Sequence, residues 1–172
     1  IKKIESCAML LIPKNASDEW KNAYAKITIR NVASIIEVSY GKYSVLNGMV
    51  VLNDKNVSDD CLYIVNGIVI LETVEKIPDL CVNGLLLKRK KSRYEMTRMN
   101  GRSVEVEDNV VIKPYPNTIE IDGDTVRSFD YNTLVAAGNN VDIVDDVTEQ
   151  MLSDKKITFA AGNEAVSYTH LR

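Results

Sequence analysis

The sequence has very little of what catalysis and metal binding most often use. Its 172 residues include a single histidine, His170, close to the C-terminal end. Ser-His-Asp and Cys-His arrangements need a histidine as their base, and zinc sites are usually built from clustered Cys and His. Neither the Gly-x-x-x-x-Gly-Lys-Ser/Thr nor the Gly-x-Gly-x-x-Gly pattern of nucleotide-binding loops occurs. We therefore predict no enzyme activity, no catalytic, cofactor-binding or metal-binding residues and no cofactor.

Cysteines, long apolar runs and excess charge are also scarce. The three cysteines, Cys7, Cys61 and Cys81, lie beside or within apolar stretches and do not form a disulfide pattern. We expect them to be reduced and buried, which favours a cytoplasmic location. No apolar run approaches the roughly 18–20 residues that cross a bilayer. The net charge of −3 argues against a general binder of nucleic acid or membrane surfaces.

A short pattern recurs along the chain. Apolar residues precede Asn-Gly and another apolar run follows it, at 45–52, 64–71 and 81–87, with weaker copies at 99–101, 121–123, 137–139 and 161–163. The glycines stand at positions 48, 67, 84, 101, 123, 138 and 162, so successive gaps are 19, 17, 17, 22, 15 and 24 residues. This spacing is typical of repeat proteins, whose loops tolerate insertions.

The repeat predicts a mainly β fold with short helices. We expect a single solenoid, leucine-rich-repeat-like or a β-helix, with roughly 16–24 residues per coil and one continuous core of inward Val, Ile and Leu. Gly permits positive φ at each turn and Asn tolerates it. The alternative is an antiparallel sheet of hairpins, because Asn-Gly between apolar runs is also a hairpin signal.

Two segments near the ends have helix signals and then lead into Lys-Ile-Thr. Residues 17–26 and 146–156 each begin with a capping residue, carry acids in the first turn and end with lysine. The middle coils replace the helix with a tighter turn, as at 72–78. We expect Trp20 to pack the first helix onto the end of the stack as a cap.

Two strings carry a resemblance. Val-Asn-Gly with its apolar run, and Asp-Val-Thr-Glu-Gln-Met-Leu before a Lys-Ile-Thr strand, resemble uncharacterised bacterial solenoid proteins of leucine-rich-repeat-like or β-helix type. The resemblance covers roughly residues 3–165 and implies architecture without chemistry. The leucine-rich pattern is poorly kept because Val and Ile replace Leu. A plain β-helix, as in polymerising bacterial cytoskeletal solenoids, therefore stays open.

The ends of the chain differ from its repeats. The chain starts with Ile1, so we take residues 1–165 as the solenoid domain of a truncated protein. Residues 166–172 resemble translated sequencing-adapter read-through and are predicted to be a non-native tail. His170 belongs to this tail.

The charged residues have a structural and a functional interpretation. Acids cluster at Asp59-Asp60, Glu105-Glu107-Asp108, Asp122-Asp124 and Asp142-Asp145-Asp146. Caps and turns explain such acids, whereas paired carboxylates in a groove would indicate glycoside hydrolysis, and Asp122-Gly123-Asp124 is only a weak calcium signal. The basic run 88–93 fits a solvated loop partly neutralised by Glu105, Glu107 and Asp108, or a patch for anions.

The leading functional hypothesis is a non-enzymatic scaffold or protein-interaction module. Its warrant is the repeat architecture together with the missing catalytic groups. A partner protein or further copies of the chain would contact one long sheet face. The alternatives are a carbohydrate-active β-helix that uses the acid clusters and a self-assembling structural solenoid.

Overall fold

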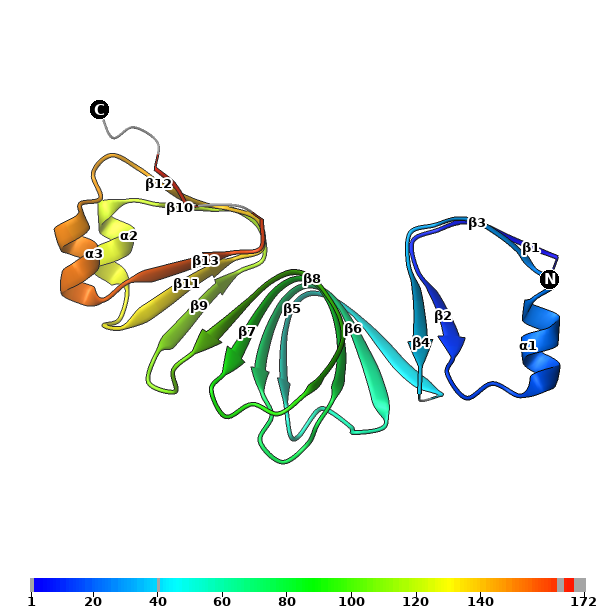
Figure 1. Cartoon of the computed structure of the whole chain (residues 1–172). Helices are drawn as coiled ribbons and strands as arrows, with labels where there is room; N and C mark the ends of the chain where they lie inside the picture. Colours follow the sequence, from blue (N-terminus) through cyan, green and yellow to red (C-terminus); the bar gives the residue numbers. More distant parts are fainter. Residues whose placement is uncertain (1, 40, 164–165, 169–172) are drawn as a thin grey trace.

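The computed structural model describes residues 2–39, 41–163 and 166–168. The chain is mainly β with three short helices in this described part, and its stacked parallel strands form a β-solenoid of about five turns. Figure 1 shows an N-terminal part, a central bent sheet and a C-terminal part arranged side by side. The predicted fold class is confirmed.

The N-terminal and C-terminal parts carry the helices, and the central part is built from four long strands. The N-terminal part contains β1 (Lys3–Cys7), β2 (Leu10–Pro13), α1 (Asp18–Tyr24), β3 (Thr28–Val32) and β4 (Ile35–Val38). The central sheet contains β5 (Lys42–Asn53), β6 (Cys61–Glu72), β7 (Asp79–Arg89) and β8 (Glu95–Val106). The C-terminal part contains β9 (Val111–Tyr115), β10 (Ile119–Ile121), α2 (Gly123–Ser128), β11 (Thr133–Ala137), β12 (Val141–Ile143), α3 (Glu149–Lys155), β13 (Thr158–Ala161) and β14 (Val166–Tyr168).

The strand pairs that the structure describes are all parallel, so the hairpin alternative is wrong. β1 pairs with β3 and β2 with β4, and the central order is β5-β6-β7-β8. The C-terminal part has the orders β13-β11-β9 and β10-β12-β14. Each Asn-Gly of the central sheet bends a strand that then continues, and the return occurs in the loops between strands.

The central glycines stack in register, at the bend of each strand. Gly48, Gly67, Gly84 and Gly101 pair in sequence and have φ of 82°, 135°, 134° and 135°. A Cβ on Gly67 would lie 2.1 Å from the carbonyl oxygen of Gly48, and one on Gly84 would lie 2.2 Å from that of Gly67. Glycine is therefore required by both the backbone conformation and the close approach of the next strand.

The C-terminal part repeats this corner with other residues. A Cβ on Gly138 would lie 2.1 Å from the oxygen of Pro116, and one on Gly162 would lie 2.3 Å from that of Gly138. Pro116, Gly138 and Gly162 therefore form one stack of corners. Gly123 was predicted as a corner of the repeat, but it begins α2 instead, because the preceding Asp122 caps that helix.

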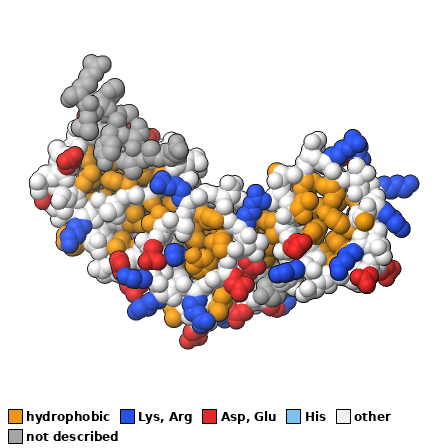
Figure 2. All heavy atoms as spheres, viewed as in Figure 1, with side chains coloured by type: hydrophobic (Ala, Val, Ile, Leu, Met, Phe, Trp, Pro, Cys, Tyr) orange, Lys and Arg blue, Asp and Glu red, His pale blue; other side chains and the backbone are white. Residues whose placement is uncertain are grey.

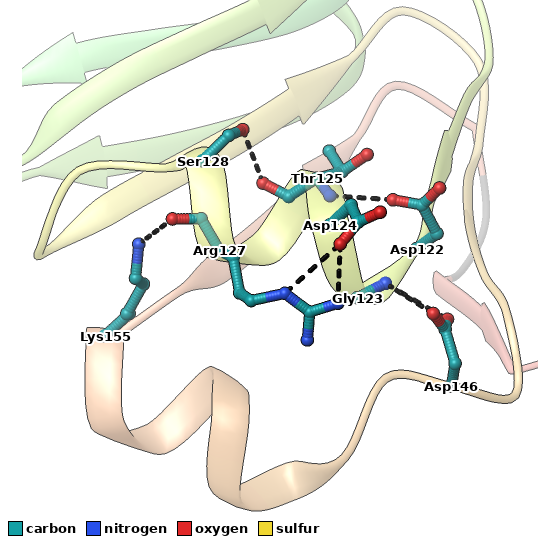
Figure 3. A network of polar contacts seen from close by, with 8 residues as sticks. All are labelled: Asp122, Gly123, Asp124, Thr125, Arg127, Ser128, Asp146 and Lys155. Carbon is teal, nitrogen blue, oxygen red and sulfur yellow. Dashed lines mark hydrogen bonds and ion pairs between the residues drawn. The ribbon is translucent and has the colours of Figure 1, made fainter.

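Both predicted helices are confirmed, and α2 is an additional one. Ser17 caps α1 and Thr148 caps α3, each accepting from a backbone amide three residues later. Figure 3 shows how α2 is joined to α3 and to the turn before α3: the amide of Gly123 donates to Asp146 of that turn at 3.0 Å, and Lys155 of α3 donates to the carbonyl of Arg127.

Trp20 does not have the role predicted for it. It is 36% exposed, and its ring stacks on Tyr24 of the same helix with a centroid distance of 4.9 Å. Helix α1 buries none of its residues. The helix therefore closes one side of the N-terminal coil (Figure 1), with its aromatic pair left partly in solvent.

The buried side chains form four clusters, so the expected single continuous core is wrong. The largest lies inside the bend of the central strands and includes Val65, Val69, Val82 and Leu86. A second cluster joins the outer face of β6 and β7 before their bends to Ile36 of the N-terminal part. A third cluster joins the outer face of β6 and β7 after their bends to β11 and β13 of the C-terminal part. The fourth lies between the C-terminal strands and their helices. Because each central strand bends once, it has one inner face and two outer faces to bury.

Candidate functional site

A groove lies between the N-terminal part and the central sheet. It encloses about 700 Å³, within the usual range of ligand sites. The residues that line this groove, here called the N-terminal groove, are Ala8, Met9, Leu11, Ala33, Ser34, Tyr43, Val45, Ile64, Asn66, Asn83, Arg98 and Asn100. Figure 2 shows the molecule hollowed between its N-terminal and C-terminal parts, above the central sheet.

A ladder of asparagines runs along the bends of the central strands. The register aligns Asn47, Asn66, Asn83 and Asn100. Asn66 Nδ2 donates to Asn47 Oδ1 at 2.9 Å, and Asn83 Nδ2 donates to Asn66 Oδ1 at 2.8 Å. Neighbouring strands lie about 4.8 Å apart, so the ladder presents amide groups at a regular spacing. Positive φ at the next residue turns these side chains outward, where they remain half-buried or exposed.

The two walls of the N-terminal groove differ in chemistry. The N-terminal part supplies small and apolar residues from the turns between strands and from β2, including Met9 and Leu11. Each central strand has a first arm before its Asn-Gly bend and a second arm after it. The central sheet supplies the outer face of the first arms, where Tyr43 is 61% exposed and Val45 is 52% exposed. An apolar wall opposite a row of amides suits a ligand with both an apolar side and a polar backbone.

Among the described residues, Arg98 is the only charged side chain that lines this groove. It stands at the β8 end of the register column that contains Val45, Ile64 and Cys81. Its Nη1 donates to the hydroxyl of Ser34, which is 9% exposed. Arg98 takes no part in the ion pairs of the described residues, which all involve other cations. The groove therefore offers an orientated guanidinium to an incoming anion.

A second groove lies on the other side of the asparagine ladder. It encloses about 380 Å³ and is lined by the corners of the central sheet and by Pro116, Gly138, Asn139, Gly162 and Asn163. Asn66, Asn83 and Asn100 line both grooves. These three residues of the ladder therefore form the boundary between the two grooves.

The predicted acid clusters lie in helix caps, turns and strands. Asp59 accepts from the amide of Ile77 at 2.6 Å, and Asp60 pairs with Lys42 at 2.5 Å. The hydrogen bond from Lys42, followed by that from Ser58, holds the pKa of Asp60 below its usual value. These bonds tie one coil to the next, as expected for structural acids.

The C-terminal acids have the same kind of explanation. Asp122 caps α2, and the hydrogen bond from Thr125 lowers its pKa. Asp124 pairs with Arg127 at 2.6 Å, as Figure 3 shows. Asp146 binds the amide of Gly123, while Asp142 lies in β12 and Asp145 in the turn after it. No group of three His, Cys, Asp or Glu among the described residues has a geometry for a metal ion.

The basic run forms a ladder of ion pairs with the following coil. Lys88 pairs with Glu105 at 3.2 Å, Lys90 with Glu107 at 3.1 Å and Lys91 with Asp108 at 3.4 Å. The predicted neutralisation by the three acids is confirmed. The run therefore joins neighbouring coils, and most of its charge has a partner within the chain.

The cysteines are free, as predicted, and two of them are buried. Cys61 and Cys81 are buried, whereas Cys7 is only partly so. Burial raises the pKa of both the Cys61 and the Cys81 thiol. A raised pKa keeps a thiol protonated near neutral pH, so these two are not activated nucleophiles.

Comparison of the chain with protein-family profiles, with curated proteins and with solved structures finds no match. The resemblance to bacterial leucine-rich-repeat-like solenoids is therefore not supported by any of these comparisons. No helix in the described part of the chain is long and apolar enough to span a membrane.

The sequence predicted none of the residues of the N-terminal groove, because they match no catalytic, nucleotide-binding or metal-binding motif. His170 lies outside the described residues, as do the rest of 169–172 and Tyr40. The backbone of 166–168 pairs with β12 as β14. The missed signal was the Asn at four equivalent repeat positions, which indicates an exposed amide row. Arg98 had no such signal, since only the fold brings it to Ser34.

Proposed function

We propose that the protein is a non-enzymatic interaction module that holds an extended segment of a partner protein in the N-terminal groove. The observation that carries the proposal is the combination of the asparagine ladder and Arg98 with an apolar wall in one groove of about 700 Å³. The proposal keeps the leading hypothesis from the sequence and gives it a location.

An extended peptide is the ligand whose chemistry matches this groove best. Its backbone carries N–H and C=O groups that the amides of Asn66, Asn83 and Asn100 can accept from and donate to. Its apolar side chains would cover Met9 and Leu11, and a carboxylate would pair with Arg98. We therefore expect preferred segments to combine an acidic residue, or a chain-terminal carboxylate, with apolar residues.

The carbohydrate-active alternative lacks support from the same groove. In the part of the chain that the structure describes, its lining includes no Asp or Glu, whereas glycoside hydrolysis uses two carboxyl groups about 5–10 Å apart across the scissile bond. None of the clustered acids is among the residues that line this groove. We retain the binding module as the single proposal.

Selection from a random-peptide display library tests the proposal. We expect wild-type protein to enrich peptides with a shared acidic and apolar pattern, and synthetic peptides of that pattern to bind in calorimetry. Arg98→Met removes the charge while keeping much of the apolar stem, and should weaken binding at least tenfold, about 1.4 kcal/mol.

The matched control is Arg102→Met. Arg102 lies in the same strand and is exposed, but it does not line the N-terminal groove. This variant should bind the peptides as well as wild type does. The proposal is wrong if no peptide family is enriched, or if Arg98→Met and Arg102→Met affect binding equally.

A further inference from the structure

The two edges of the central sheet differ sharply in chemistry. Edge strand β5 carries four large apolar side chains that are exposed: Tyr43 at 61%, Val45 at 52%, Met49 at 46% and Val51 at 40%. They lie on the outer face of both arms of the bent strand. No strand of the described residues pairs with the free side of β5. At its C-terminal end the Asn56 side chain donates to the carbonyl of Val51 at 2.8 Å and accepts from the amide of Asn53 at 2.9 Å.

The opposite edge is protected by charge. The register places Arg98 at the end of the column of Val45, and Arg102 at the end of the column of Met49. Glu95 and Glu105 also lie on β8. Charged side chains on an edge strand prevent pairing with further chains, and terminal repeats of solenoids usually have such a polar face. Strand β5 has only one charged residue, Lys42, which pairs with Asp60.

The bend of β5 also has unused space and an unused donor. Each later glycine of the stack covers the carbonyl oxygen of the one before it, but a Cβ on Gly48 would meet nothing within 4 Å. The ladder bonds run from each Nδ2 toward the preceding strand, from Asn83 to Asn66 and from Asn66 to Asn47. The Nδ2 of Asn47 is thus left for a group outside β5.

We propose that two copies of this chain associate through their β5 edges, antiparallel and around a two-fold axis near Asn47. An axis along the bisector of the bend maps the first arm of one strand onto the second arm of the other. Pairing centred on Asn47 sets Tyr43 opposite Val51 of the second copy and Val45 opposite Met49 of the second copy. Cross-strand apolar pairs of this kind stabilise sheets, and a two-fold contact uses the same patch twice.

Charge selects this arrangement over an open filament. A head-to-tail stack would set the β8 edge of one copy against the β5 edge of another. Arg98 would then face Val45, and Arg102 would face Met49, so charged groups would be buried against apolar ones. The antiparallel contact brings no such pair together and closes after two chains.

Light scattering after size exclusion tests the association, with the double variant Met49→Lys, Val51→Lys as the probe. Neither residue lines the N-terminal groove, so the double variant leaves the groove lining unchanged, although the contact itself would also cover Tyr43 and Val45 of that lining. We expect wild type at twice the chain mass of 19.2 kDa and the double variant as a folded monomer, since both side chains are exposed. The control Val74→Lys, at a loop residue that is 53% exposed, should stay dimeric.

An oxidative cross-link tests the geometry of the contact. Asn47→Cys should give a disulfide-linked dimer under mild oxidation, because opposed residues in an antiparallel pair have Cα atoms about 4.5–5.5 Å apart. Wild type, which keeps Cys7, and Val74→Cys should not. A monomeric wild type, growth of filaments, an unchanged double variant or the absence of the Asn47→Cys cross-link would each overturn the proposal.

Discussion

Replacing Gly84 by alanine tests the packing of the glycine stack. The φ of 134° at Gly84 is a conformation that L side chains rarely adopt, and holding it costs about 1–3 kcal/mol. The new Cβ would also lie 2.2 Å from the carbonyl oxygen of Gly67. That oxygen belongs to a strand held by ladders on both sides, so the overlap is relieved only by separating strands. We expect a total loss of about 3 kcal/mol or more, a large part of the 5–15 kcal/mol that stabilises a typical domain.

Two other glycines separate the cost of the positive φ from the cost of the steric overlap. Gly48 has a φ of 82° but nothing within 4 Å of an added Cβ, so Gly48→Ala should lose only the conformational cost of about 1–2 kcal/mol. Gly41 has open space and no positive φ. Gly41→Ala should therefore be neutral or stabilise by up to about 1 kcal/mol.

The assay is urea unfolding followed by far-ultraviolet circular dichroism. The midpoint should fall in the order Gly41→Ala, Gly48→Ala, Gly84→Ala, because a change in stability moves the midpoint. If Gly84→Ala and Gly48→Ala shift the midpoint equally, close approach contributes nothing and our account of the stack is refuted.

Two further predictions concern charges that join coils. Backbone hydrogen bonds, the largest from Lys76, lower the pKa of Asp54; its stabilisation is therefore present above the unfolded pKa of about 3.9 and is lost as the pH falls through the folded value. The difference in urea midpoint between wild type and Asp54→Asn should thus shrink on acidification from neutral pH, and a constant difference would contradict this. Arg89→Ala should cost about 1–3 kcal/mol, because Arg89 donates to the carbonyls of Glu107 and Val110 at 2.8 and 3.0 Å. Exposed Lys91, with one ion pair at 3.4 Å, should cost under about 1 kcal/mol when replaced by alanine, and equal losses in thermal unfolding would refute the distinction.

The repeat pattern was enough to predict the solenoid, because each coil obeys the same local rules. Asn-Gly with apolar runs on both sides recurs wherever a strand bends, and Ser17 and Thr148 mark helix starts through short-range capping bonds. The ion pairs of the basic run also followed from the sequence, since stacked coils bring residues one repeat apart side by side. Gly123 was misassigned because Asp-Gly fits both a corner and a capped helix.

Tertiary structure alone decided the rest. The sequence could not distinguish a bend from a hairpin at Asn-Gly, because both need positive φ, and only the parallel ladders settle it. It could not divide the core into four clusters, since that depends on how the three parts pack. Nor could it bring Arg98 beside Ser34 in one groove: the two residues are 64 positions apart, and no local rule relates them. Local repetition determined the architecture of this chain, while contacts between its parts formed the groove that contains Arg98.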